Sequence, residues 1–352
     1  MSIAWKNFDE LKAYECLKAL RGKVCLNKEL AGEQGAKRVA DYCAPMAAGL
    51  AYHYAAKQVD DEVLRALQAL ADEAQLIEKY RALLEGEVIN TGEKRMVLHQ
   101  LTRGQQLGAV TADGTDKRAF YEGERLKAAE FARKVHQGEI ANEKGEPFTT
   151  AVQIGIGGSD LGPRAMYIAL DNWAKESGLK KMEARFISNV DPDDAAGVLG
   201  DIDVSRSLFI LVSKSGTTLE TLTNEAFVKD ALKKAGLDAS RHMVAVTSET
   251  SPLASSSDYL AAFFMDDYIG GRYSSTSCVG GVVLSLAFGP EVFERFLQGA
   301  AEEDRLALNG DILSNPDMLD ALIGVYERNV QGYPATAVLP YSQGLSRFPA
   351  HL

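Results

Sequence analysis

The sequence predicts an α/β protein in which a parallel sheet, covered by helices on both faces, follows a mostly helical N-terminal region. Between residues 151 and 264, short continuous apolar runs alternate with segments of helical periodicity. This alternation is typical of βαβ units, whose strands are buried on both faces. Residues 1 to about 118, in contrast, show helical patterns and few strand signals.

The helical pattern is clearest in DDEVLRALQALADEAQLIEKYRALLEG, residues 60–86, and in KRAFYEGERLKAAEFARKVHQG, residues 117–138. Each segment ends on a glycine, Gly86 or Gly138, and glycine is common just past the end of a helix. We expect a helix in each segment. In the first, the apolar residues that recur at helical spacing are Val63, Leu67, Leu70, Ala74, Ile77 and Leu84.

The sheet is expected to contain five strands. In chain order they are AVQIGIGG (151–158), ARFISNV (184–190), SLFILVSK (207–214), HMVAVTS (242–248) and AAFFMDD (261–267). Helices are expected near 160–177, from the third strand to about 235, at 278–297 and at 316–331. The segment TAVLPY (336–341) is predicted to be the opening strand of a further α/β unit.

The length of 352 residues exceeds what one hydrophobic core usually organises. We expect a helical region at 1–118, an α/β domain at 119–297, and linker helices with the start of a second α/β domain at 298–352. With 49 acidic and 38 basic residues, the net charge of -11 argues against a general affinity for nucleic acid or anionic membrane.

The four cysteines, Cys16, Cys25, Cys43 and Cys278, show neither CxxC spacing nor a histidine in a ligand arrangement. They are expected to be free thiols in a reducing compartment. The N-terminal segment MSIAWKNFDELKAYE has no apolar run of signal-peptide length, and no run anywhere in the sequence is long enough to span a membrane. A cytoplasmic location is therefore expected.

Three strand-to-helix junctions carry unusual polar residues at the edge where parallel α/β sheets bind ligands. In the first, VQIGIGGSDLGP, Gly157 and Gly158 precede Ser159 and allow backbone N–H groups to approach an anion. Asp160 stands where the third glycine of a GxGxxG motif would fall. The usual dinucleotide-binding fold is therefore disfavoured.

The second junction, LVSKSGTT (211–218), places six small polar or basic residues before a helical pattern: Ser213, Lys214, Ser215, Gly216, Thr217 and Thr218. Thr217 with Glu220 fits a capping box, so these hydroxyls could simply start a helix. One helix, however, needs one cap residue. Backbone amides, several hydroxyls and one ammonium group would suit a phosphate monoester.

The third junction, MDDYIGGRYSSTSCVGG (265–281), places Gly270, Gly271 and Arg272 after a strand. In isolation it is a tight turn with a surface arginine. If all three strand ends converge on one ligand, however, a planar guanidinium there could stabilise a developing oxyanion.

Together these segments resemble the glucose-6-phosphate isomerase family, also called phosphoglucose isomerases. IGIGGSDLGP, SKSGTTLETLTN and DYIGGRYS are similar to segments of that family in the same order, as are INTGEKRMVLH (89–99) and LPYSQGLSRFPAHL (339–352). The similarity covers nearly all of the chain from about residue 90. Two departures are Gly92, where the family usually has threonine, and Ser215-Gly216, which replaces a bulkier pair.

The resemblance implies paired, doubly wound sugar-isomerase (SIS) domains, reversible conversion of glucose 6-phosphate and fructose 6-phosphate through an enediolate, no metal or organic cofactor, and a homodimer. It implies that Arg272 is catalytic and lies beside C1 and C2 of the sugar. The residues it implies for substrate binding, most of them at the phosphate, are Gly158, Ser159, Ser213, Lys214, Ser215, Gly216, Thr217, Thr218 and Gly271.

Isomerisation also needs a base that moves a proton between C1 and C2. In the family this base is a glutamate in a segment that directly follows the equivalent of FPAHL, and a histidine and a lysine come later. The sequence ends at Leu352, so we expect the chain to be the front part of the enzyme, and no glutamate within it is assigned as the base. Whether the chain is active by itself stays open.

A non-catalytic sugar-phosphate-binding module is the alternative, because it would keep the phosphate site and need no base. A nucleotide-dependent dehydrogenase is disfavoured by the missing GxGxxG motif. A P-loop NTPase is excluded more firmly because no GxxxxGK[ST] occurs.

Overall fold

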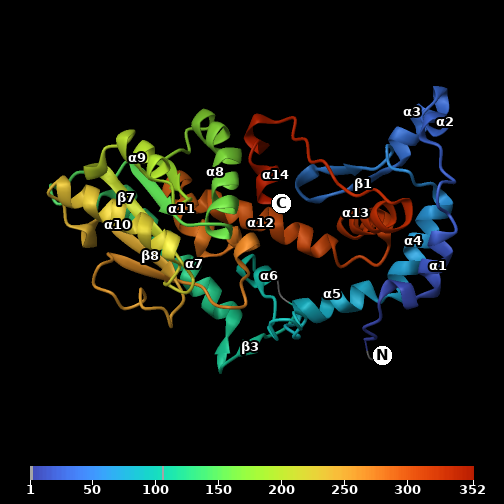
Figure 1. Cartoon of the computed structure of the whole chain (residues 1–352), viewed down its shortest axis with the longest axis horizontal. Coiled ribbons are helices and arrows are strands. Elements are labelled where there is room, and N and C mark those ends of the chain that lie inside the picture. Colours follow the sequence, from blue (N-terminus) through green and yellow to red (C-terminus); the bar gives the residue numbers. More distant parts are fainter. Residues whose placement is uncertain (1–2, 105–106) are drawn as a thin grey trace. The chain divides into compact units, whose positions relative to one another are not determined.

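The computed structural model describes residues 3–104 and 107–352 and contains two compact units (Figure 1). The first comprises Met1–Glu87 with Gln298–Ala337, and the second comprises Val88–Leu297 with Val338–Leu352. The three consecutive domains expected from the sequence stay a prediction. By internal contacts, residues 88–118 group with the sheet, and residues 298–337 group with the N-terminal helices.

The first unit is mostly helical, as its sequence predicts. Its elements are α1 (Lys12–Lys18), α2 (Leu26–Glu29), α3 (Gly32–Asp41), β1 (Cys43–Pro45), β2 (Ala51–His53), α4 (Asp61–Glu73), α5 (Leu76–Leu84), α13 (Pro316–Val325) and the π-helical turn Tyr326–Gln331. Apolar residues of α1, α4 and α13 form one core. The buried Tyr326 hydroxyl donates to the Leu20 carbonyl at 3.1 Å, which ties the late segment to the N-terminal helices.

The helical pattern at residues 60–86 gives two helices rather than one continuous helix. Asp60 starts α4 by accepting a hydrogen bond from the Val63 amide at 2.8 Å. Gln75 then adopts a left-handed conformation (φ 54°), which interrupts the helix before α5. Apolar periodicity continues across this break, so the sequence pattern did not reveal it.

The second unit is built around a five-stranded parallel sheet, which confirms the predicted α/β fold. Its strands are β5 (Thr150–Ile154), β6 (Glu183–Ile187), β7 (Ser207–Val212), β8 (Met243–Thr247) and β9 (Ala261–Phe264), in the spatial order β6-β5-β7-β8-β9. Every neighbouring pair in this sheet is parallel. The carboxyl ends of all five strands therefore lie along one edge.

Helices cover both faces of this sheet (Figure 1). The α-helices that lie wholly within this unit are α6 (His99–Thr102), α7 (Lys117–Gln137), α8 (Gly158–Glu176), α9 (Pro192–Gly200), α10 (Leu219–Lys234), α11 (Cys278–Phe288) and α14 (Phe348–His351). A short pair of strands, β3 (Thr111–Ala112) and β4 (Thr115–Asp116), precedes α7. Alternate strand residues pack on α7, α8 and α11 on one face and on α9 and α10 on the other. This alternation explains the continuously apolar strands.

Two further expectations about the later part of the chain are corrected. The helix predicted at 278–297 is divided at Gly289 (φ 93°) into α11 and α12 (Pro290–Leu306). TAVLPY (336–341) forms no strand, and most of its side chains are exposed, including Leu339 at 71% and Tyr341 at 101%. Apolar and β-branched residues favour a strand only where a neighbouring strand accepts the backbone hydrogen bonds.

Candidate functional site

Three loops at the carboxyl edge of the sheet form the candidate site. They follow β5, β7 and β9 and contain the three polar junctions identified in the sequence. Strands β5 and β7 are direct neighbours, with Ile154 opposite Leu211, so their loops leave the sheet side by side. The loop after β9 reaches both of them through a backbone contact and an ion pair.

The backbone contact joins Gly158, at the start of α8, to Gly271. A Cβ atom placed on Gly158 would lie 2.1 Å from the carbonyl carbon and oxygen of Gly271 and 2.6 Å from the amide nitrogen of Arg272. Only glycine permits such an approach without moving one backbone. Gly158 therefore sets the separation between the first loop and the segment that carries Arg272.

The loop after β7 is held from within by Ser213, whose side chain is almost fully buried. Its amide donates to the Val246 carbonyl of β8 at 3.0 Å, and its hydroxyl accepts from the Gly216 amide at 3.2 Å and donates to Thr218 at 3.3 Å. Gly216 is left-handed (φ 68°), and a Cβ there would lie 2.1 Å from the Ser251 hydroxyl oxygen. Ser213 and Gly216 thus shape the loop.

Ser215 and Thr217 are exposed on this loop, whereas Lys214 and Thr218 are half-buried. The capping box that Thr217 and Glu220 could have formed, the alternative to an anion site, is not present. The N-cap residue of α10 is Thr218, which makes no capping hydrogen bond with its side chain. The Thr217 hydroxyl instead donates to the Ser215 hydroxyl at 3.0 Å. The helix start therefore does not use these hydroxyls, and capping does not explain them.

The ion pair joins Lys214 to the loop after β9. Its Nζ lies 3.3 Å from Oδ1 of Asp267, and Nη1 of Arg95 lies 3.5 Å from the same oxygen. Arg95 belongs to INTGEKRMVLH, which also packs here through the Leu98 amide, a donor to the Tyr268 carbonyl at 3.1 Å. Neither Arg95 nor Asp267 was assigned a role from the sequence. Their only signal was a position inside a recognised segment, INTGEKRMVLH or DYIGGRYS.

Arg272 is exposed beside the three loops and is held by α14. Its Nη1 donates to the carbonyls of His351 at 2.8 Å and Ala350 at 3.3 Å. These carbonyls lie at the end of α14, where carbonyl groups have no partner within the helix. Burial, and then the charge of Arg272, lower the pKa of His351, which favours a neutral imidazole beside the guanidinium.

His99 also borders the site. In the sequence it belongs to no motif that would indicate acid or base chemistry. Its Nε2 lies 3.1 Å from the Gly270 carbonyl oxygen. Burial lowers the pKa of His99, and the charges of Arg103 and Lys214 lower it further. A neutral His99 then donates to Gly270 and holds the glycine pair of the third loop.

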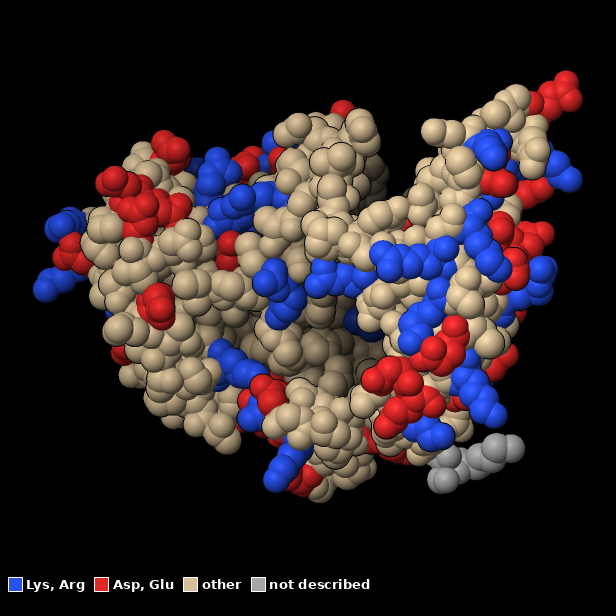
Figure 2. All heavy atoms as spheres, turned by 45° about the vertical axis from the view of Figure 1, so that its right-hand side comes forward, with Lys and Arg blue, Asp and Glu red and all other residues tan. Residues whose placement is uncertain are grey.

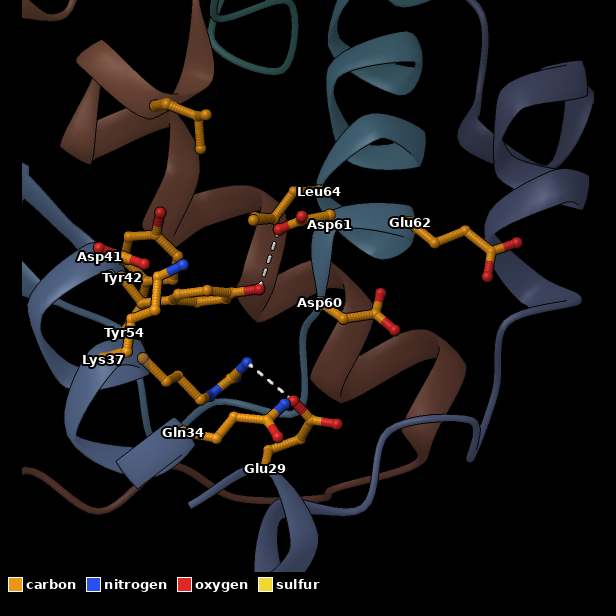
Figure 3. A pocket seen from close by; sticks show the side chains of 12 residues that line it. Glu29, Gln34, Lys37, Asp41, Tyr42, Tyr54, Asp60, Asp61, Glu62 and Leu64 are labelled. Carbon is orange, nitrogen blue, oxygen red and sulfur yellow. Dashed lines mark hydrogen bonds and ion pairs between the residues drawn. The ribbon is translucent and has the colours of Figure 1, made fainter. Parts of the chain in front are cut away.

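A separate pocket lies in the first unit and is lined mainly by residues of α3 and of the start of α4 (Figure 3). Two interactions join its lining residues: the Tyr42 hydroxyl donates to Asp61 at 3.0 Å, and Arg38 lies 3.8 Å from Glu29. Burial, followed by the hydrogen bond to Asp61, raises the pKa of Tyr42 to about 12. None of the residues predicted for binding or catalysis lines this pocket.

Over residues 3–104 and 107–352, no cluster of histidine, cysteine and acidic residues has an arrangement that could hold a metal ion. Within the same ranges, no helix is both long and apolar enough to span a bilayer. All four cysteines are free thiols, as predicted. On the face shown in Figure 2, acidic and basic side chains are interspersed.

A family model described as phosphoglucose isomerase matches residues 53–352. The chain belongs to the phosphoglucose isomerase family. The sequence is 60% identical to the glucose-6-phosphate isomerase of Treponema denticola, covering 99% of this chain and 67% of that protein. It is 45% identical to the glucose-6-phosphate isomerase of Desulfotalea psychrophila, covering 100% of this chain and 66% of that protein.

A solved glucose-6-phosphate isomerase from Chlamydia trachomatis superimposes on this phosphoglucose isomerase family member with a TM-score of 0.88 at 39% identity. The superposition covers 98% of this chain and 65% of that structure. The chain thus spans about two thirds of the length of the relatives it matches. The family suggested by the three junctions is confirmed.

Proposed function

We propose that this chain provides the sugar-phosphate site of a glucose-6-phosphate isomerase, which interconverts glucose 6-phosphate and fructose 6-phosphate. The convergence of the three junctions at one edge of the sheet carries the proposal. The loop Ser213–Thr218 would take the phosphate, because exposed hydroxyls, backbone amides at the start of α10 and the Lys214 ammonium are all suited to an anion.

Arg272 would act on the sugar itself. An enediolate carries negative charge on oxygen, and a guanidinium that is already held in place stabilises such charge without further reorganisation. The contact between Gly158 and Gly271 places Arg272 next to the loop that begins α8. Gly158, Ser159 and Gly271 would line the space between the phosphate loop and Arg272.

We also propose that the protein works as a homodimer in the cytoplasm. The family membership supports both statements, and the free thiols are consistent with a reducing compartment. Light scattering at several protein concentrations would measure the dimer. A mass of 38.1 kDa at every concentration would contradict it for this chain.

The proposal predicts that Lys214→Met weakens fructose 6-phosphate binding roughly ten- to hundredfold, because a charge-assisted hydrogen bond is lost. Isothermal titration calorimetry on the chain measures this. Lys229→Met is the control, since the side chains of Lys214 and Lys229 are 34% and 32% exposed and each pairs with an aspartate whose side chain is 59% exposed, although Lys229 also pairs with Glu225 at 2.8 Å. Absence of binding by the unchanged chain, or equal loss in both variants, would contradict the proposal.

A further inference from the structure

Asp267 is the residue at which the recognised segments meet. Its Oδ1 is shared by Lys214 of the phosphate loop, at 3.3 Å, and by Arg95 of the segment INTGEKRMVLH, at 3.5 Å. Asp267 itself precedes the glycine pair of the third junction by three residues. The Asp267 carboxylate is therefore paired with Lys214, the cation that the proposed function assigns to the substrate phosphate.

The neighbouring acid, Asp266, has a different environment. Its Oδ1 accepts from the Tyr121 hydroxyl at 2.7 Å and from the Tyr268 amide at 3.1 Å, and its Oδ2 lies 3.2 Å from Lys117 Nζ. The Asp266 side chain is 18% exposed and the Asp267 side chain is 59% exposed. Asp266 thus fixes the turn, which leaves the carboxylate of Asp267 in solvent beside two cations.

Such an exposed ion pair adds little to folding stability, typically well below the contribution of a buried contact. A phosphate monoester carries more negative charge than one carboxylate and offers three acceptor oxygens. It can therefore displace Asp267 from Lys214 at small cost. The backbone of Lys214 stays in place during this exchange, because its carbonyl accepts from the Ser248 amide at 3.0 Å.

We infer that Asp267 is an internal competitor of the substrate phosphate: it holds Lys214 and Arg95 while the site is empty and releases Lys214 when a sugar phosphate binds. The inference rests on the proposed function of the Ser213–Thr218 loop. Asp267 then sets how tightly the site binds phosphate groups and keeps it from retaining weakly charged anions. Arg95 holds the displaced carboxylate beside the site.

The test is the Asp267→Asn variant of this chain, titrated by calorimetry with fructose 6-phosphate and with inorganic phosphate. Removing the competing charge should tighten binding about two- to fivefold at low salt, the range that corresponds to one exposed ion pair. The gain should shrink as the ionic strength rises. Asp258→Asn is the matched control, because Asp258 is equally exposed and pairs with Lys229 on α10. It should leave both affinities unchanged.

A second pair of variants separates competition from general electrostatic repulsion. If Asp267 acts by occupying Lys214, Asp267→Asn should have no effect in a chain that already carries Lys214→Met. Weaker binding by Asp267→Asn would instead show that Asp267 positions Lys214, and an equal gain with and without Lys214 would show simple repulsion. Either result overturns the inference and leaves the proposed function intact. Failure of the unchanged chain to bind fructose 6-phosphate would overturn both.

Discussion

Replacing Arg272 with alanine is expected to lower the kcat of glucose 6-phosphate isomerisation about 10²- to 10³-fold in the gene product that carries this chain. The reason is that the guanidinium acts on charge that develops only on the way to the enediolate. The Michaelis constant should change far less, since the loop Ser213–Thr218 still holds the phosphate. A coupled assay in the direction of fructose 6-phosphate formation measures both parameters.

Arg272→Lys should lose nearly as much activity, because a lysine ammonium does not reproduce the planar group held by the carbonyls of Ala350 and His351. Arg241→Ala is the control: Arg241 is exposed and lies just before β8, at the opposite end of the strand from the site. A raised Michaelis constant with an unchanged kcat in Arg272→Ala would assign Arg272 to ground-state binding and contradict its proposed role.

Gly158→Ala is expected to abolish measurable fructose 6-phosphate binding. It should also lower the free energy of unfolding by about 1–3 kcal/mol, the usual cost of overpacking a core. Its Cβ would meet backbone atoms of Gly271 and Arg272 at 2.1–2.6 Å, and backbone cannot turn aside as a side chain can. The loops would have to separate, which would carry Arg272 away from the first loop. Calorimetric binding and thermal unfolding of the chain measure the two effects.

Gly197→Ala provides the control for this change. Gly197 lies within α9, and a Cβ there would meet nothing within 4 Å. Alanine favours a helix over glycine by up to about 1 kcal/mol, so this variant should bind normally and be equally or more stable. Normal sugar-phosphate binding by Gly158→Ala would mean that the contact with Gly271 does not shape the site.

The alternation of apolar runs and helical segments was sufficient to predict the parallel sheet and the sequence positions of its strands. Each predicted strand overlaps one of β5 to β9, because buried parallel strands are apolar on both faces. Contacts between distant segments were not predictable in this way. The hydrogen bond from the Tyr326 hydroxyl to the Leu20 carbonyl, for example, joins residues 306 positions apart, and no local sequence pattern predicts it. The same limit applies to TAVLPY, whose strand pattern lacks a pairing neighbour.

The candidate site was predictable in its location but not in its detail. Glycines, hydroxyls and one lysine at strand ends indicated an anion site, and the structure brings those loops together. Residues that act on other residues were missed: Asp267 reads as an ordinary surface acid until Lys214 and Arg95 are seen beside it. The close approach of Gly158 and Gly271 was also hidden, since their separation in the chain exceeds one hundred residues, about the length of a small domain.

The loop after β7 is proposed to bind the phosphate of a sugar phosphate. A crystal structure of this chain with fructose 6-phosphate tests it most directly. We expect phosphorus density within hydrogen-bond distance of the Lys214 ammonium, the Ser215 and Thr217 hydroxyls and the amides that begin α10, with Asp267 turned away from Lys214. Density for the sugar phosphate at another place, or an unoccupied loop at saturating ligand, would contradict it.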